Sequence, residues 1–335
     1  MPFSPTLDAQ LCQAVVTAAL IRLTEFYVFP DRAEAIDHAI RQRLEHGEYD
    51  AMTTGKELQD TFTAHVRQLY NDRHLRLVYY DEAQPARDNA YTDPAWLANY
   101  WHAAALDNYG VYKIERLAGN VGYLDLRSID EAEYTAETLA AAMAVLSNTS
   151  ALIIDLRQNS GGANSGVAFF CSYFFPAEPV HLNDVYSRPD DRTQQFWTAA
   201  YLPGKRYLDK PVFVLTSTRT FSGGEEIAYD LQALRRAVIV GETTRGGAHP
   251  VDVYQIHPHF DIRVPTARAI NPITSTNWEG NGVAPDIATP QADALRVAYR
   301  EALTHIIAQE QPDTPGPDRT MIAEARTAQQ AFESA

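Results

Sequence analysis

Cysteine is scarce in this 335-residue chain, which contains only Cys12 and Cys171. Neither belongs to a paired motif such as C-x-x-C, so we expect no disulfide framework and no cysteine metal site, and we interpret both as buried, reduced thiols. Long apolar runs are also lacking. None approaches the roughly 18 uninterrupted apolar residues of a membrane span, so the sequence predicts no span.

Positive charge is the minority charge. The chain has 28 Lys and Arg against 43 Asp and Glu, a formal net charge of −15. A surface this acidic repels phosphate backbones, which argues against a nucleic-acid partner. The first residues lack a basic start, an apolar run and a small-residue cleavage site, so we expect no signal peptide and a cytoplasmic protein.

The hydrophobic pattern predicts several regions. Hydrophobic residues make up 45% of the chain, enough for a sizeable core. Apolar residues first recur at helical spacing, and then short apolar runs alternate with helical segments, a pattern typical of an α/β fold with largely parallel strands. The last segment is rich in Pro, Asp, Thr and Gly. The predicted regions are a helical N-terminal domain (1–72), a connecting strand and helix segment (73–110), an α/β core (111–310) and a flexible tail (311–335).

Ser222 stands where a strand gives way to a helix. The buried strand pattern of 211–215 is followed by a polar turn and then by Ser222-Gly223-Gly224-Glu225. This pattern places the hydroxyl at a helix N-terminus, where unpaired N–H groups and the helix dipole stabilise developing negative charge. The pattern alone equally allows a plain N-cap, with Glu225 completing a capping box.

A second strand, 151–156, runs into a turn containing Gly161 and Gly162. Such a turn can present backbone N–H groups to an oxyanion, although a tight turn alone has the same sequence. Both turns follow predicted strands, and ligand sites of parallel sheets gather at the carboxyl ends of the strands. Two further Gly-rich loops follow, at 241–248 and 277–286.

The ordered motifs D-L-R-x-N-x-G-G, F-S-x-G-E, G-E-x-T-x-G-G and E-G-x-G-V-x-P-D resemble those of the tail-specific (C-terminal processing) serine protease family. The likeness covers roughly residues 111 to 305 and is to the branch that includes tricorn protease and the interphotoreceptor retinoid-binding protein. The resemblance implies a crotonase-like α/β spiral core. It also implies that Ser222 is the nucleophile and that Gly161 or Gly162, together with Gly223, forms the oxyanion hole.

One position departs from the family pattern. Many members use a Ser–Lys dyad, but the position of that Lys is Gly247 here, and no Lys follows Lys210. The tricorn-like branch uses His and Glu instead. The resemblance therefore implies that His74, within N-D-R-H-L-R-L, is the general base for Ser222, and that Glu279 is a remoter member of the charge network. Tricorn has a Ser directly before its His, where this chain has Arg73.

Four residues near these motifs are candidates for a substrate cleft: Arg245, Gly247, His249 and Trp278. His249 is also a rival base, although a loop position is the plainer interpretation. Arg245 has the charge to meet a substrate carboxylate, and Trp278 suits either a cleft or the core. His257 and His259 form an H-x-H pattern without a third ligand cluster, so we expect no metal, and nothing implies an organic cofactor.

We therefore predict a serine hydrolase, most simply a peptidase, that acts on a peptide or small acyl substrate through an acyl-enzyme. The family usually carries a PDZ domain, but the roughly 45 residues between His74 and Val121 are too few for one. Two alternatives stay open: a non-catalytic binder of an apolar ligand such as a retinoid or lipid, and an ester or amide hydrolase of small-molecule metabolism. Assembly into a homo-oligomer stays open as well.

Overall fold

The computed structural model describes residues 7–333. These residues form two compact units. Unit 1 consists of the chain up to Ala103 with the later segments 184–194 and 249–270, and unit 2 holds the remainder. The first six residues of the predicted N-terminal domain and the last two of the predicted tail lie outside the described residues.

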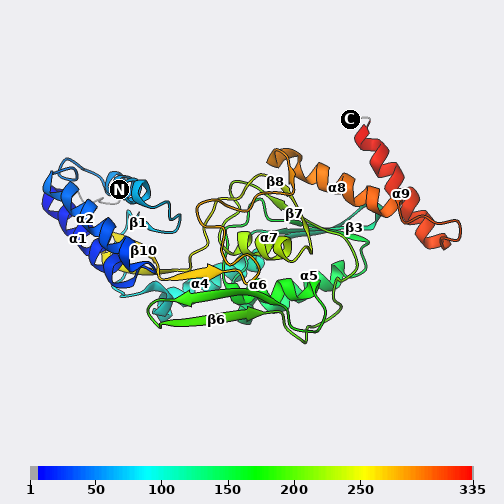
Figure 1. Cartoon of the computed structure of the whole chain (residues 1–335), viewed down its shortest axis with the longest axis horizontal. Helices are drawn as coiled ribbons and strands as arrows, with labels where there is room; N and C mark the ends of the chain where they lie inside the picture. The colour runs from blue at the N-terminus through cyan, green and yellow to red at the C-terminus, as the bar shows by residue number, and fades with distance from the viewer. Residues whose placement is uncertain (1–6, 334–335) are drawn as a thin grey trace. The chain divides into compact units, whose positions relative to one another are not determined.

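Unit 1 begins with three helices: α1 (Ala9–Phe26), α2 (Pro30–Glu45) and α3 (Gly55–Leu69). Asp8 caps α1 by accepting the Leu11 N–H at 2.8 Å. Thr54 and Glu57 form a reciprocal capping box at the start of α3. These three helices confirm the helical pattern predicted for the first part of the chain, and Figure 1 shows α1 and α2 in blue.

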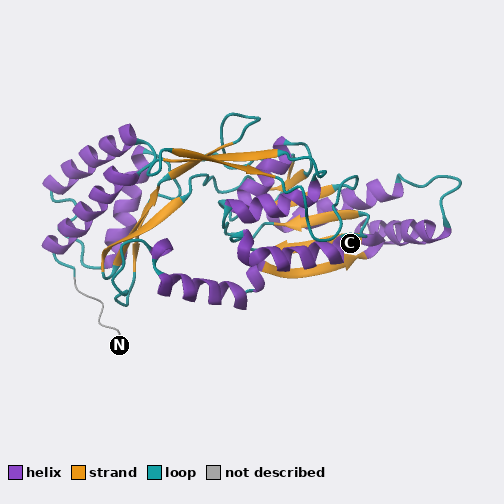
Figure 2. Ribbon diagram, turned by 90° about the horizontal axis from the view of Figure 1, so that it is seen from below, coloured by secondary structure: helices purple, strands orange, loops and turns teal. Residues whose placement is uncertain are grey.

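A small antiparallel sheet completes unit 1. Its strands are β1 (Arg76–Tyr79), β10 (Phe260–Pro265) and β9 (Val251–His257), in that order. Helices and strands share one core that contains Leu20, Phe62 and Phe260, all fully buried. Figure 2 shows the helices beside these orange strands. Unit 1 therefore depends on a hairpin that comes about 180 residues after β1.

Unit 2 is built on a six-stranded sheet in the order β12-β8-β7-β4-β3-β2. Its strands are β2 (Val111–Leu117), β3 (Val121–Leu126), β4 (Ala151–Asp155), β7 (Val212–Thr216), β8 (Val238–Gly241) and β12 (Ile287–Ala288). Only the edge strand β2 pairs antiparallel, and the other pairings are parallel. This arrangement confirms the predicted α/β fold with largely parallel strands.

Helices cover both faces of this sheet. They are α5 (Ala132–Leu146), α6 (Asn164–Cys171), α7 (Gly223–Ala233), α8 (Gln291–Ile307) and α9 (Gly316–Glu333). Alternate residues such as Tyr123 and Ile153 pack against α8 and α9, so their sequence neighbours face the opposite side of the sheet. In Figure 1, α8 and α5 lie on opposite sides of β3 and β7.

Further helices and strands complete the two units. They are α4 (Pro94–Leu106), β5 (His181–Ser187), β6 (Arg192–Trp197), β11 (Ala267–Ile270) and the short 3-10 helices η1 (Ala90–Thr92), η2 (Asn108–Gly110), η3 (Ala118–Asn120) and η4 (Ser172–Phe174). Strands β11, β5 and β6 form a further sheet in that order. Within residues 7–333, no helix combines the length and apolar character needed to cross a bilayer.

Two predictions about organisation need correction. The segment predicted as a flexible tail contains α9, which buries Ile322 and Ala325 against the same core as α8. Its small apolar residues recur at helical spacing behind a Pro-rich start, and the prediction gave weight only to that start. The chain also divides differently from the predicted boundaries at 72 and 110, because unit 1 includes β9 and β10.

Candidate active site

The candidate nucleophile lies in a constrained turn between β7 and α7. Ser222 immediately precedes α7 and has φ 52° and ψ −122°. Positive φ is uncommon for a residue other than glycine, and such backbone strain concentrates at functional sites. The turn is bound to the residue that follows β4, because the Thr220 hydroxyl donates a hydrogen bond to the Leu156 carbonyl at 2.8 Å. The half-buried Ser222 side chain therefore stands at the positive end of the α7 dipole.

Glu225 joins this turn to the loop after β8. One oxygen of its buried carboxylate accepts the Ser222 N–H at 2.9 Å and the Gly247 N–H at 2.8 Å. The other oxygen accepts the Gly246 N–H at 2.6 Å and the Thr244 hydroxyl. Burial raises the pKa of Glu225 and outweighs these hydrogen bonds, which favour its charged form. The residue expected only to cap a helix thus fixes the Ser222 backbone and a second loop together.

The predicted oxyanion-hole glycines lie against Ser222, but they differ in role. A Cβ placed on Gly161 would lie 2.6 Å from the Ser222 Cβ, and one placed on Gly223 would lie 3.1 Å from the Gly162 nitrogen. The Gly161 N–H, however, donates to the Asn159 side chain at 2.8 Å. Gly161 is therefore corrected from oxyanion donor to a residue whose missing side chain permits the close approach. Gly162 and Gly223 lie beside Ser222, and their oxyanion role stays a prediction.

The 277–286 loop, which carries Glu279, forms hydrogen bonds that hold the 241–248 loop in place. Glu279 accepts the Ala248 N–H at 2.6 Å. The indole N–H of Trp278 donates to the Gly247 carbonyl at 2.8 Å. Trp278 is only 2% exposed, so the structure corrects it from a lining residue of a cleft to a buried support. Gly247, where the resemblance drawn from sequence would place a Lys, is held in place by contacts with this loop and with Glu225.

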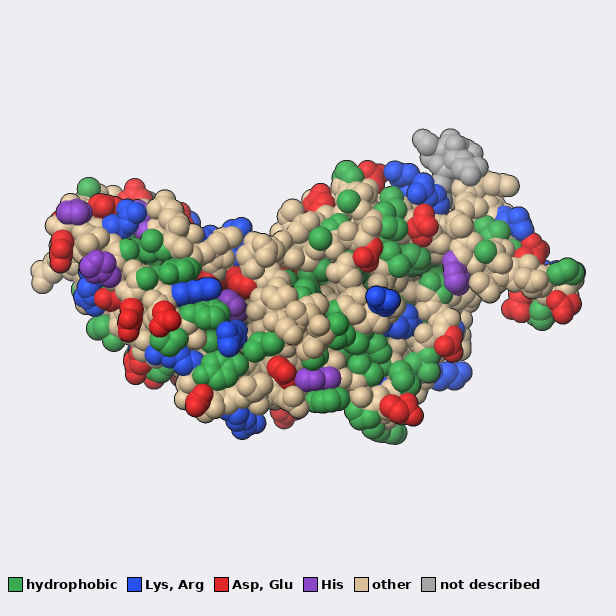
Figure 3. Space-filling view, in the orientation of Figure 1, with side chains coloured by type: hydrophobic (Ala, Val, Ile, Leu, Met, Phe, Trp, Pro, Cys, Tyr) green, Lys and Arg blue, Asp and Glu red, His purple; other side chains and the backbone are tan. Residues whose placement is uncertain are grey.

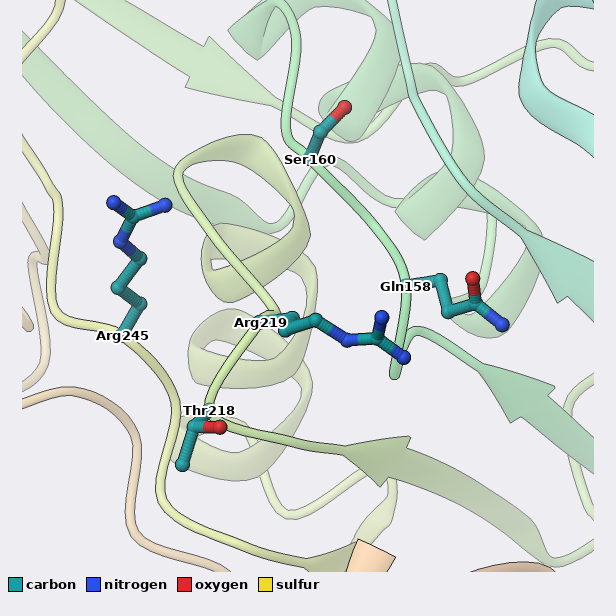
Figure 4. A pocket seen from close by; sticks show the side chains of 5 residues that line it. All are labelled: Gln158, Ser160, Thr218, Arg219 and Arg245. Carbon is teal, nitrogen blue, oxygen red and sulfur yellow. The ribbon is translucent and has the colours of Figure 1, made fainter.

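Polar side chains line a pocket at the carboxyl ends of the parallel strands of unit 2. The pocket has a volume of about 400 Å³, and Figure 4 shows its five lining residues. They come from the loops after β4, β7 and β8 and are Gln158, Ser160, Thr218, Arg219 and Arg245. Arg245 thus lines a pocket, and its place in a substrate cleft stays a prediction. Arg219, three residues before Ser222, escaped notice in the sequence because an isolated loop Arg carries no pattern.

Unit 1 holds two histidines around one buried carboxylate. Asp72 Oδ2 pairs with His249 Nδ1 at 2.8 Å and accepts the Tyr27 hydroxyl at 3.1 Å. Asp72 Oδ1 accepts the backbone N–H of His74 at 3.0 Å. Burial raises the pKa of Asp72, but the neighbouring His249 outweighs it and holds that pKa below its usual value. Asp72 lies within the motif that drew attention to His74, yet the sequence gave no reason to pair it with residue 249.

The predicted base, His74, is almost wholly enclosed. It is 6% exposed, and burial lowers its pKa to about 3 against the opposing charge of Asp72. The imidazole is therefore neutral at pH 7, as a general base must be, but it is a weak base. His249 is as deeply buried and packs edge-on against the Phe29 ring at 5.3 Å. The pairing of His74 with Ser222 stays a prediction.

Two models of known protein families match this chain. The family model of Peptidase family S41 matches residues 120–289, and the model of the N-terminal domain of S41 peptidases in the eukaryotic interphotoreceptor retinoid-binding protein matches residues 6–102. The first match covers half of the chain. The chain therefore belongs to Peptidase family S41, which confirms the resemblance to tail-specific proteases drawn from the four motifs.

Individual proteins similar to this chain are named as carboxyl-terminal-processing proteases. A carboxyl-terminal-processing protease of Synechocystis is 28% identical over 170 residues, which are 51% of this chain and 37% of that protein. A chloroplastic carboxyl-terminal-processing peptidase of Arabidopsis thaliana is 24% identical over 180 residues, 53% of this chain and 35% of that one. The aligned part thus spans well under two thirds of either relative.

Among solved structures, the photosystem II D1 C-terminal processing protease has a similar fold. The TM-score is 0.53 at 15% sequence identity, and the match covers 84% of this chain and 93% of that one. At this identity the match establishes the fold alone. The fold of most of this chain is therefore similar to that of a known protease, while the catalytic residues have to be argued from this chain.

Proposed function

We propose that this protein is a serine-type peptidase of the C-terminal processing class, built on a crotonase-like spiral core, which cleaves peptides through an acyl-enzyme on Ser222. The observation that carries the proposal is the strained Ser222 backbone at the start of α7, beside Gly162 and Gly223. A protein that only bound an apolar ligand would need no such turn. The built nucleophile turn therefore favours the peptidase over the non-catalytic binder.

The reaction follows from this arrangement. The Ser222 oxygen attacks the peptide carbonyl while a histidine removes its proton, and the carbonyl oxygen becomes an oxyanion. The N–H groups of Gly162 and Gly223, aided by the α7 dipole, stabilise that charge. The histidine then protonates the leaving amine as the C–N bond breaks. Water, deprotonated by the same histidine, hydrolyses the acyl-enzyme and releases Ser222.

The predicted base is His74, and His249 is the second candidate. His74 contacts Asp72 through its backbone N–H, whereas the His249 ring pairs with the carboxylate through Nδ1. A carboxylate on Nδ1 fixes the tautomer, leaves Nε2 as the proton acceptor and stabilises the imidazolium that forms. The Asp72–His249 pair thus supplies the two components that a serine nucleophile requires, so we favour His249 over His74.

Chain connectivity also supports His249. The backbone nitrogens of Ser222 and Gly247 bind the same Glu225 oxygen at 2.9 and 2.8 Å, so they are at most about 6 Å apart. His249 follows Gly247 by two residues, which span at most about 7.6 Å between Cα atoms. His249 thus follows, by two residues, a loop that is bound by the same carboxylate as the Ser222 backbone.

Glu279 then has a positioning role. It binds the Ala248 N–H at 2.6 Å, directly before His249 in the chain. Loss of this contact would free the backbone that carries the candidate base. We therefore propose that Glu279 acts through the backbone of the 244–249 segment and not by direct contact with substrate.

Hydrolysis of fluorescein-labelled casein tests the proposal. The Ser222→Ala variant should lose all hydrolysis, and His249→Ala should lower kcat by at least about 100-fold, with a smaller effect for His74→Ala. Ser147→Ala is the matched control, because Ser147 follows α5 at the opposite, amino-terminal edge of the sheet. Hydrolysis that survives Ser222→Ala would contradict the proposed function, and a larger loss with His74→Ala would return the base to the residue predicted from sequence.

A further inference from the structure

The pocket beside Ser222 contains cationic side chains without an acidic partner. Within residues 7–333, neither Arg219 nor Arg245 forms an ion pair. Every lining side chain can donate a hydrogen bond, and no carboxylate lines the pocket. The chain as a whole is acidic, with net charge −15, and Figure 3 shows Asp and Glu spread over the face that it displays. The pocket is therefore locally cationic in an acidic chain.

Both arginines have a fixed backbone. The Arg245 N–H donates to the Thr220 carbonyl at 3.1 Å, and its guanidinium lies 4.8 Å from the centre of the Phe221 ring. The Arg219 N–H donates to Ser217 Oγ at 3.1 Å. The Phe221 ring restricts the Arg245 guanidinium, so this cation loses less conformational entropy when it binds a ligand.

The pocket adjoins the proposed nucleophile. Ser160 directly precedes Gly161, whose added Cβ would lie 2.6 Å from the Ser222 Cβ. Arg219 is three residues before Ser222, and Arg245 precedes the two glycines bound by Glu225. A peptide attacked by Ser222 therefore places a neighbouring substrate residue within reach of these side chains.

We propose that this pocket is a specificity subsite that binds a carboxylate of the substrate, with Arg219 and Arg245 as its cationic groups. The inference rests on the proposed function. Figure 4 shows Arg219 extending toward Gln158 and Arg245 on the other side of the pocket. Arg219 and the Gln158 amide supply donors on one wall, and Arg245 adds positive potential from the opposite wall. The carboxylate is either an acidic side chain or the C-terminal group of the peptide.

Peptide retention tests the subsite without requiring turnover. A pool of synthetic octapeptides, half with a free C-terminal carboxylate and half amidated, and with Glu or Gln at each position, is passed over immobilised Ser222→Ala protein. Retained peptides are quantified by mass spectrometry. Because charge-assisted hydrogen bonds favour the ionised ligand, we expect carboxylate-bearing peptides to be enriched about fivefold to tenfold at 50 mM NaCl, and less at 500 mM.

Variants made in the Ser222→Ala protein test whether Arg219 and Arg245 cause the enrichment of carboxylate-bearing peptides. Combined Arg219→Gln and Arg245→Gln changes should reduce the enrichment to about one, while combined Arg296→Gln and Arg300→Gln changes, which remove the same charge at exposed positions on α8, should leave it intact. Enrichment of free over amidated C-termini identifies the terminal group, and enrichment of Glu over Gln at one position identifies a side chain. Equal retention of charged and neutral peptides would overturn the subsite. Absence of casein hydrolysis by the wild type would overturn the proposed function instead, because retention is read on protein that cannot turn over.

Discussion

A pair of buried acids on α7 predicts an unusual dependence of stability on pH. Glu226 and Asp230 lie one turn apart on α7 and are 3% and 0% exposed. Glu226 accepts the side-chain N–H groups of Asn164 at 2.6 Å and Asn183 at 3.1 Å. Asp230 accepts the side-chain N–H of Asn271 at 3.1 Å. Amide donors offset little of the cost of burying two negative charges so close together.

Burial raises the pKa of Glu226 from its ordinary 4.5 to about 7, and burial together with the charge of Glu226 raises the pKa of Asp230 well above its ordinary value. The folded state therefore binds protons that the unfolded state releases between about pH 4.5 and 7. The free energy of unfolding should fall as pH rises through this window. For Glu226 alone, the rise from 4.5 to about 7 corresponds to about 3 kcal/mol, at about 1.4 kcal/mol per pKa unit.

Glu226→Gln should remove most of this cost. Relative to the wild type, we expect the variant to gain about 3 kcal/mol at pH 8 and about 1 kcal/mol at pH 5. The new amide can be accommodated, because the buried Asn183 Oδ1 has no hydrogen-bond partner among the described residues and can accept its N–H after an amide flip.

Urea unfolding followed by tryptophan fluorescence measures the gain, since Trp278 lies 5.2 Å from Tyr229 of α7, ring centre to ring centre. Glu137→Gln on the exposed side of α5 is the matched control and should change little at either pH. Equal effects of Glu226→Gln at pH 5 and pH 8, or destabilisation at both, would refute the reasoning that burial of charge dominates this site.

Three further predictions concern the catalytic apparatus. Asp72→Asn should lower kcat for casein by at least about 100-fold, because an amide no longer fixes the His249 tautomer; unchanged kcat would remove the pair from the mechanism. Glu225→Gln should cost about 1–3 kcal/mol in urea unfolding, because a donor NH₂ would meet one of the N–H groups that Glu225 now accepts. Gly161→Ala should abolish labelling by a fluorophosphonate, because its φ is +103° and its new Cβ would lie 2.6 Å from the Cβ of the serine. Gly204→Ala is the matched control, since its φ is +81° and nothing lies within 4 Å of the added Cβ; equal labelling of both variants would contradict the steric argument.

Much of the fold was accessible from the sequence because its signals are local. Apolar runs such as 151–156 and 211–215 become central parallel strands, and the capped helices near the N-terminus form where their patterns indicate. The hairpin of β9 and β10 could not be assigned to unit 1 in the same way. Its alternating residues show that a strand exists but carry no information on which distant strand it pairs with.

The candidate site shows the same contrast. Ser222 and its neighbouring glycines follow from ordered motifs and from the strand-turn-helix pattern. The role of Glu225 and the Asp72–His249 pair depend on contacts between residues that are 21 and 177 positions apart in sequence. A buried carboxylate is recognised as a partner only when its surroundings are known, which is why His74 drew attention from its motif while His249 remained a rival.

Mass-spectrometric mapping of a fluorophosphonate adduct tests the central claim most directly, because the reagent modifies only a serine made nucleophilic by its surroundings. The account predicts a single adduct on the peptide that contains Ser222, formed much more slowly in His249→Ala and absent from Ser222→Ala. A folded wild-type protein that takes up no label, or that takes it up on another residue, would contradict the account.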